Sequence, residues 1–373
     1  MKTWSDLRRA SPAQLIDWAA AQPWGRAMAT CQQDAEWHAE GDVWTHTCLV
    51  CAELEKLAEW PALDADRQLT LLLTALLHDS GKPATTAVDP ATGRVTSARH
   101  AAVGAAIARR VLGELGCDYA TREHIAALVR YHGRPVYLLE KPAPEREVIA
   151  RSWALENRLL HLFAVADARG RDSRSDDRPE DNLHLWKLVA EESGCYDRPY
   201  AFTSDHARFL FFRDRLSNLH YTPHEAFRCT VTLMSGLPGS GKDTWLAHHR
   251  PAMPVVSLDA VRGELDVDPT ENQGTVVQAA RENCREHLRA RRDFAFNATN
   301  ITPLTRERWI SLFADYEVRV EIVYLEPPLS VVLRQNRERS TPVPDDVIRR
   351  LAEKLDPPDA TEAHRIIVKT RFE

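Results

Sequence analysis

Residues 229–244 read Cys229-Thr-Val-Thr-Leu-Met-Ser-Gly-Leu-Pro-Gly-Ser-Gly-Lys-Asp-Thr244, and they decide the fold of the second half of the chain. An apolar run of strand length is followed by a glycine-rich loop and then by a helical pattern, which is the context of a Walker A phosphate-binding loop. The glycines allow backbone N–H groups to cradle phosphates, and the helix N-terminus adds a favourable dipole. The predicted nucleotide-binding residues are Gly236, Gly239, Ser240, Gly241, Lys242, Asp243 and Thr244.

One position in this loop departs from the motif. Asp243 stands where the Walker A pattern has Ser or Thr to bind Mg²⁺. Lys242 would still reach the β- and γ-phosphate oxygens, so the departure concerns the metal ligand and leaves the phosphate cradle intact. Asp243 could hold Mg²⁺ directly or through water, or Thr244 could serve instead. The sequence therefore predicts ATP with Mg²⁺ as the cofactor of this region.

Strand and helix patterns alternate through the rest of this region. The strand candidates are Val255–Leu258, Phe294–Phe296 and Val318–Tyr324, and the helix candidates are Thr275–Arg291, Thr305–Phe313 and Leu329–Arg339. Strands that alternate with helices indicate an α/β domain with a parallel sheet.

Residues 1 to about 220 show a different pattern, with apolar residues at i, i+3 and i+4 and without β-branched runs of strand length. The helix candidates are Thr45–Glu59, Arg67–Leu77, Ala101–Leu115, Thr121–Tyr131, Pro144–Asp167 and Asp181–Glu192, and residues 168–181 are expected to form a charged loop. The length of 373 residues also favours two domains. We therefore expect an all-α domain at 1–222 and an α/β domain at 223–373.

Composition limits the partners and the compartment. The chain has 48 Lys and Arg against 54 Asp and Glu, a net charge of −6, so a nucleic-acid partner would have to be held by local basic patches. The first residues show no basic segment followed by an apolar one, and no apolar run approaches the length of a membrane span. The seven cysteines are scattered. We expect a cytoplasmic protein without a membrane segment.

The helical region carries histidines and aspartates that could bind metal ions. The stretch Leu76-Leu-His-Asp-Ser-Gly-Lys82 ends an apolar helix in an adjacent His–Asp pair. A neutral His nitrogen combined with an Asp oxygen that can bridge two ions suits Mn, Fe, Co, Ni or Zn better than Mg. The candidate ligands, in chain order, are His46, His78, Asp79, His100, His132 and Asp167. His124 lies eight residues before His132, near the same helix face, and remains an alternative ligand.

This order of histidines and aspartates on helices resembles the HD phosphohydrolase superfamily over about residues 35–180. The segment from Trp37 to Thr47 is similar to the HD domain of bacterial CCA-adding tRNA nucleotidyltransferases, which carry phosphatase and 2′,3′-cyclic phosphodiesterase activity. The resemblance implies one or two divalent transition-metal ions. One ion would be bound by His46, His78, Asp79 and Asp167, and a second by His100 and His132 with Asp79 as the bridge.

Positively charged side chains near these ligands would offset the charge of a phosphate. Lys82 follows the His–Asp pair directly, and Arg169 and Arg171 follow Asp167. Arginine can bind phosphate through two parallel hydrogen bonds. His38 would either contact the substrate or cap a turn.

The segment Ser257-Leu-Asp-Ala-Val-Arg262, after the second predicted strand, resembles the S-x-D-x-x-R signature of P-loop 5′-hydroxyl polynucleotide kinases. The resemblance covers about residues 229–373. It implies that Asp259 is the general base for a 5′-OH and that Arg262 binds the phosphate on the 3′ side of the acceptor nucleoside. Asn297-Ala-Thr-Asn300 resembles a further segment of the family, with Asn297 in place of the usual Asp. The arginines that resemble the lid of the family, and that would act with Lys242 on the transferred phosphoryl group, are Arg334, Arg337 and Arg339.

The two halves together resemble the bacterial HD-Pnk family of end-healing enzymes. The resemblance implies that the first domain opens or removes a 2′,3′-cyclic, 2′- or 3′-phosphate and that the second phosphorylates a 5′-OH, leaving the sealing step to a separate ligase. The expected partners are RNA ends, with DNA ends also open. Two other interpretations are an HD nucleotidase fused to a small-molecule kinase, and a tRNA-end binding module with an inactive HD domain. The identity of the metal ions and the oligomeric state stay open.

Overall fold

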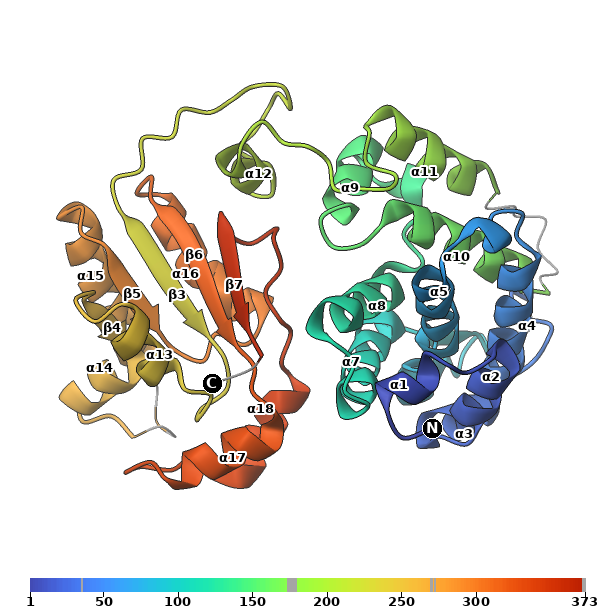
Figure 1. Cartoon of the computed structure of the whole chain (residues 1–373), viewed down its shortest axis with the longest axis horizontal. Helices are drawn as coiled ribbons and strands as arrows, with labels where there is room; N and C mark the ends of the chain where they lie inside the picture. The colour runs from blue at the N-terminus through green and yellow to red at the C-terminus, as the bar shows by residue number, and fades with distance from the viewer. Residues whose placement is uncertain (35, 173–179, 269–270, 272, 371–373) are drawn as a thin grey trace. The chain divides into compact units, whose positions relative to one another are not determined.

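The computed structural model describes residues 1–34, 36–172, 180–268, 271 and 273–370. The chain divides into two compact units, Met1–Ala201 and Phe202–Glu373 (Figure 1). Within the described residues, no helix combines the length and the apolar character that crossing a bilayer requires. All seven cysteines are free thiols.

The first unit is helical, as predicted. Its helices are α1 (Trp4–Leu7), α2 (Pro12–Ala20), α3 (Pro23–Ala29), α4 (Val43–Lys56), α5 (Ala65–Leu77), α6 (Lys82–Thr85), α7 (His100–Glu114), α8 (Tyr119–Tyr131), α9 (Pro144–Arg151), α10 (Asn157–Arg169) and α11 (Glu180–Glu192), with short 3₁₀ turns η1 (Trp60–Ala62) and η2 (Leu138–Glu140). Aspartate caps begin three of the helices that form the site, because the side chains of Asp42, Asp64 and Asp118 accept hydrogen bonds from the first free backbone N–H groups of α4, α5 and α8. Helix α5 is buried from Leu69 to Leu77 and forms part of the core.

The first unit differs from the sequence expectation in two places. A short antiparallel hairpin of β1 (Thr86–Val88) and β2 (Val95–Ser97) lies between α6 and α7, where no strand was expected. The single helix expected at Pro144–Asp167 is divided into α9 and α10, since the chain leaves the helical path after Ser152 and Glu156 caps the next helix. The expected charged loop at 168–181 begins only after Arg169, and residues 173–179 of it lie outside the described residues.

The second unit is an α/β domain with a five-stranded parallel sheet in the order β4-β5-β3-β6-β7 (Figure 1). Its strands are β3 (Thr230–Ser235), β4 (Val255–Ser257), β5 (Phe294–Asn297), β6 (Arg319–Leu325) and β7 (Arg365–Lys369). Its helices are α12 (Asp205–Phe211), α13 (Lys242–His249), α14 (Leu258–Glu264), α15 (Gly274–Arg289), α16 (Pro303–Ala314), α17 (Leu329–Arg337) and α18 (Asp345–Glu353). The central strand β3 leads directly into the glycine-rich loop, which therefore opens at the carboxyl edge of the sheet.

Helix α12 belongs to the second unit, although the sequence placed the division at residue 222. Phe209 packs in the same core cluster as Cys229 and Val231. The guanidinium of Arg208 donates hydrogen bonds to the backbone carbonyls of Ala363 and His364, at 3.3 and 2.7 Å. These contacts hold the segment before the first strand on the sheet that follows, and they are invisible in a local sequence pattern.

Candidate metal centre and phosphate-binding loop

The structure brings the predicted histidines and aspartates of the first unit together from five helices or helix ends. They form two adjacent groups. The first contains His46, His78 and Asp167, and the second contains Asp79, His100 and His132. Within each group the ligand atoms all lie within 4.8 Å of one another. His78 and His132 each stand at the C-terminal end of a helix, and His100 begins α7. Gly81 makes the approach of α7 possible, because a Cβ there would lie 2.1 Å from the carbonyl oxygen of His100.

Backbone carbonyls set the tautomer of three of these rings. The Nδ1 atoms of His78, His100 and His132 lie 2.7, 2.8 and 2.7 Å from the carbonyl oxygens of Ala75, Ser97 and Val129. Because a carbonyl oxygen only accepts hydrogen bonds, Nδ1 carries the proton and Nε2 keeps its lone pair in each neutral ring. This is the usual second contact of a metal-binding histidine.

The Nε2 atoms then face other electron-rich atoms. Nε2 of His100 lies 3.3 Å from Nε2 of His132, and Nε2 of His78 lies 3.1 Å from Oδ2 of Asp79. Nε2 of His78 and Oδ1 of Asp79 are buried and have no hydrogen-bond partner among the described residues. Unpaired lone pairs at these distances are unfavourable without a cation between them. The donor set therefore fits divalent transition-metal ions.

Burial and charge favour the metal-binding protonation states of His132 and Asp79. Burial, helped by the neighbouring His78, lowers the pKa of His132 to about 3, so the ring stays neutral. Burial alone would raise the pKa of Asp79, but His78 and Lys82 hold it well below its usual range. The carboxylate is therefore ionised while the imidazole is neutral, as ligands must be.

Two of the three predicted cations lie at this cluster. Nζ of Lys82 is 2.7 Å from Oδ2 of Asp79 and 2.6 Å from the side-chain oxygen of Gln33. The guanidinium of Arg171 is 2.6 Å from Oδ2 of Asp167. Arg169 is exposed at the end of α10, and no such contact is seen for it within the described residues.

The geometry favours His132 over His124 as the histidine of this cluster. Nε2 of His124 accepts a hydrogen bond from the backbone N–H of Glu156 at 3.0 Å, and the ring lines a separate cavity with Arg67. Eight residues of helix advance about 12 Å along the axis, which is too far for one cluster to include both rings.

Glu40 completes the surroundings of His46, and the sequence argument assigned it no role. Its Oε1 lies 3.0 Å from Nδ1 of His46 and 2.7 Å from Nδ1 of His38. The opposite nitrogen of His46, Nε2, lies 3.0 Å from Oδ1 of Asp167. Glu40 thus holds the His46 ring with Nε2 facing the cluster. His38 contacts the same carboxylate oxygen of Glu40. The local signal was a carboxylate six residues before a candidate ligand in the chain, which is too common to single out.

We expect Glu40→Gln to weaken metal binding by about tenfold, because loss of an outer carboxylate typically costs 10–100-fold in metal affinity. Titration of the metal-free protein with Mn²⁺ or Zn²⁺ measures this. The exposed Glu36, which lies in the same loop, supplies the control as Glu36→Gln. An unchanged affinity in Glu40→Gln would show that His46 does not need this contact.

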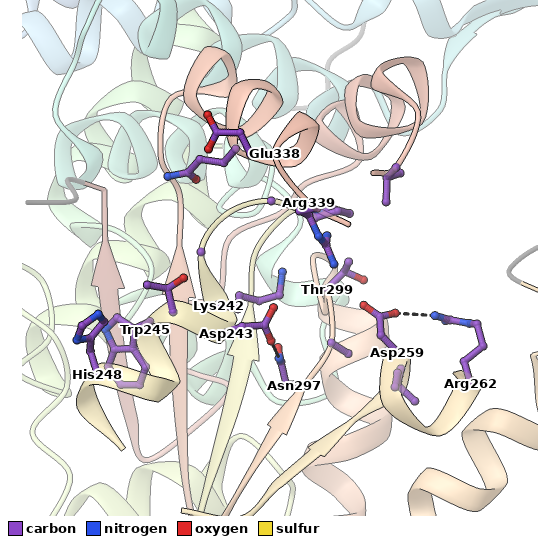
Figure 2. Close-up of a pocket in the computed structure, with 18 of the residues that line it drawn as sticks. Lys242, Asp243, Trp245, His248, Asp259, Arg262, Asn297, Thr299, Glu338 and Arg339 are labelled. Carbon is purple, nitrogen blue, oxygen red and sulfur yellow. Dashed lines mark hydrogen bonds and ion pairs between the residues drawn. The ribbon is translucent and has the colours of Figure 1, made fainter. Parts of the chain in front are cut away.

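The second unit holds a cavity of about 910 Å³ over the glycine-rich loop (Figure 2). Lys242 begins α13, and its Nζ donates hydrogen bonds to the carbonyl oxygens of Gly236 and Leu237 at 2.9 and 2.8 Å. Gly239 has a φ of +78°, and a Cβ there would lie 2.9 Å from the carbonyl oxygen of Val332. Burial lowers the pKa of Lys242 to about 8. The loop is thus closed tightly around a half-buried ammonium group.

Asp259 and Arg262 line the same cavity as the glycine-rich loop, which agrees with their predicted placement. Both lie on α14, one turn apart, and the guanidinium of Arg262 contacts the carboxylate of Asp259 (Figure 2). Arg262 is also held by the side-chain oxygen of Gln273 at 2.9 Å. Thr299 and Asn297, at the end of β5, line the cavity as well.

Only one of the three predicted lid arginines lines this cavity. Arg339 does so from the turn after α17, and Glu338 and Gln335 line the cavity as well (Figure 2 labels Arg339 and Glu338). Arg334 is exposed and lines no part of the cavity, and Arg337 forms an ion pair with Asp345 on α18. Arg334 and Arg337 are three residues apart and share one face of α17, whereas Arg339 follows the end of the helix and leaves that face, so the three arginines do not converge on one phosphate.

We expect Arg339→Ala to lower the rate of phosphoryl transfer from ATP by about a hundredfold or more, because arginines on the transferred group are worth that much in related chemistry. Arg337→Ala is the control, since its exposed ion pair contributes little. Steady-state rates at saturating ATP measure both. Equal losses of transfer rate in Arg339→Ala and Arg337→Ala would contradict the assignment of Arg339 as the lid arginine at the cavity.

Comparison with known proteins agrees with the two units. The HD domain family model matches residues 43–154, and the AAA domain family model matches residues 231–358. A CC-adding tRNA nucleotidyltransferase of Thermus thermophilus is 36% identical over 117 residues, 31% of this chain and 24% of that protein. An L-seryl-tRNA(Sec) kinase of Methanococcus maripaludis is 23% identical over 135 residues, 34% of this chain and 53% of that protein.

A crystal structure of a gluconokinase from Sinorhizobium meliloti matches with 18% identity and a TM-score of 0.29, over 38% of this chain and 82% of its own. The chain thus spans about a quarter of the nucleotidyltransferase and about half of the L-seryl-tRNA(Sec) kinase. The chain carries an HD phosphohydrolase domain, similar to the HD region of tRNA nucleotidyltransferases, followed by a P-loop kinase-like domain.

Proposed function

We propose that this protein repairs broken RNA ends. The HD domain would open and remove 2′,3′-cyclic, 2′- or 3′-phosphates, and the P-loop domain would transfer phosphate from ATP to a 5′-OH, leaving the sealing step to a separate ligase. The observation that carries the proposal is that the P-loop Lys242 and the Asp259–Arg262 pair line one cavity, while the metal-binding cluster occupies the other unit. Relatives of both halves are named for tRNA substrates, which favours RNA over a small metabolite.

In the HD domain, the two groups around His78 and Asp79 would hold the metal ions. When bound, divalent ions neutralise phosphate charge and activate water. Lys82 and Arg171 add positive charge beside the ligand carboxylates and would contact the remaining phosphate oxygens.

In the kinase domain, phosphoryl transfer requires positioning more than covalent chemistry. Asp259 would accept the proton of the attacking 5′-OH, and Arg262 would bind the neighbouring phosphate of the acceptor strand. Lys242 and Arg339, which line the same cavity, would bind the transferred phosphoryl group.

The test is a short RNA with a 5′-OH and a 2′,3′-cyclic phosphate, incubated with ATP, Mg²⁺ and Mn²⁺, with both ends read by mass spectrometry. We expect a gain of phosphate at the 5′ end and its loss at the 3′ end. A free nucleoside that competes successfully as acceptor would instead support a small-molecule kinase. Tight RNA binding without change at either end would support a binding module.

A further inference from the structure

Asp243 and Asn297 form a pair inside the P-loop cavity. Asp243 lies in the first turn of α13, directly after Lys242, and Asn297 is the last residue of β5. Strands β3 and β5 are parallel neighbours, which places the end of β5 beside the glycine-rich loop. The side-chain amide of Asn297 donates a hydrogen bond to Oδ1 of Asp243 at 2.6 Å (Figure 2). Both residues line the cavity that holds Lys242.

The pairing fixes which way each side chain faces. A carboxylate only accepts hydrogen bonds, so the NH₂ group of Asn297 must face Asp243 and its Oδ1 must face elsewhere. That Oδ1 is buried and has no hydrogen-bond partner in the part of the chain that the structure describes. Asn297 is only 6% exposed, whereas Asp243 is exposed to the cavity. The amide is therefore a fixed support, and the carboxylate is the group that reaches solvent.

The two residues reverse the pattern that the motifs predict. A Walker A loop carries a neutral hydroxyl at position 243, and the related kinases carry a carboxylate at position 297. Here the carboxylate stands on the loop side and the neutral side chain on the strand side. The site still offers one carboxylate and one neutral oxygen, which are ligand types that Mg²⁺ uses beside nucleotide phosphates.

We propose that Asp243 supplies the carboxylate toward the Mg²⁺ of the donor nucleotide and that Asn297 positions it, the two having exchanged the roles that the motifs assign. The proposal rests on nucleotide binding by the P-loop domain and is independent of the acceptor. The competing explanation is that Asp243 only stabilises the N-terminus of α13 by its charge. That role would change thermal stability and leave metal affinity unaltered.

The test uses the full chain, the non-hydrolysable ATP analogue AMP-PNP and Mn²⁺ as a paramagnetic substitute for Mg²⁺. Nucleotide affinity is measured in EDTA and at saturating Mn²⁺, and bound Mn²⁺ is counted by electron paramagnetic resonance. We expect Asp243→Ser and the nearly isosteric Asp243→Asn to reduce the gain in affinity that Mn²⁺ provides by about tenfold or more. Affinity in EDTA should be unchanged or higher, because a negative charge near the phosphates is removed.

The reciprocal variant separates the exchange from a simple loss of charge. Asp243→Ser combined with Asn297→Asp restores the usual order of ligands, and we expect its Mn²⁺-dependent gain to return to within about threefold of the unmodified chain. Asp346→Ser is the matched control, because Asp346 is also an exposed acid in the first turn of a helix and pairs only with Arg350 among the described residues. It should leave metal binding unchanged.

Three results would overturn the proposal. One is an unchanged Mn²⁺-dependent gain in both single variants, with a lowered melting temperature. Another is an equal loss of affinity with and without metal. The third is a double variant no better than Asp243→Ser. If RNA with a 5′-OH did not accept phosphate, these measurements would still test the proposal, because they use no acceptor. If the unmodified chain did not bind AMP-PNP, both this assignment and the kinase half of the proposed function would be refuted.

Discussion

Replacing His78 or Asp79 with alanine is expected to reduce metal-dependent phosphate release by at least about a hundredfold, while ATP-dependent phosphorylation of a 5′-OH continues at the normal rate. The two residues stand at the junction of the two groups of metal-binding atoms, and Asp79 is within 3.4 Å of Nε2 of His100 as well as 3.1 Å of Nε2 of His78. Phosphate release from a cyclic-phosphate RNA and metal content after dialysis measure the effect.

His124→Ala is the matched control for this prediction. His124 is a half-buried histidine of the same unit, but it accepts its hydrogen bond from Glu156 outside the cluster. We expect it to retain both metal and phosphate release, whereas His132→Ala should lose them. If His124→Ala lost metal while His132→Ala kept it, the assignment of the second group would be wrong.

Lys242→Ala and Asp259→Ala are each expected to abolish transfer from ATP to a 5′-OH, by different routes. Lys242→Ala removes the ammonium group that the glycine-rich loop encloses, so binding of ATP itself should weaken. Asp259→Ala should keep ATP binding and lower the transfer rate by about 10²–10⁴-fold, the usual value of general-base catalysis. Filter binding of labelled ATP and a 5′-end labelling assay separate the two effects.

Asp315→Ala is the control for Asp259, because Asp315 is an exposed aspartate that contacts Arg215 on the surface of the same unit. It should transfer phosphate normally, and phosphate release by the HD domain should persist in all three variants. Near-normal transfer by Asp259→Ala would exclude this residue as the general base and would remove the main support for a hydroxyl acceptor at that wall of the cavity.

Local sequence was sufficient to predict the candidate residues of each site. The strand, loop and helix of residues 229–244 follow one another in the chain, so the phosphate cradle needs no distant partner. The candidate ligands His46, His78, Asp79, His100, His132 and Asp167 were predicted from the adjacent His–Asp pair and from their order along the chain, which resembles the HD superfamily, and the structure places them in two adjacent groups. The short hairpin before α7 was missed, since three-residue strands leave too little periodicity to detect.

Distances between separate elements were decided only by the tertiary structure. The exclusion of His124, the contact of Glu40 with His46, and the separation of Arg339 from Arg334 and Arg337 all depend on where helices cross and how they are rotated. The contact of Asp243 with Asn297 depends on the parallel pairing of β3 with β5. The sequence by itself determined which reactive groups are present and which local turns carry them. Which of them meet was decided by packing, because side-chain direction depends on the rotation of each element about its axis, and only the buried apolar faces of the whole fold set that rotation.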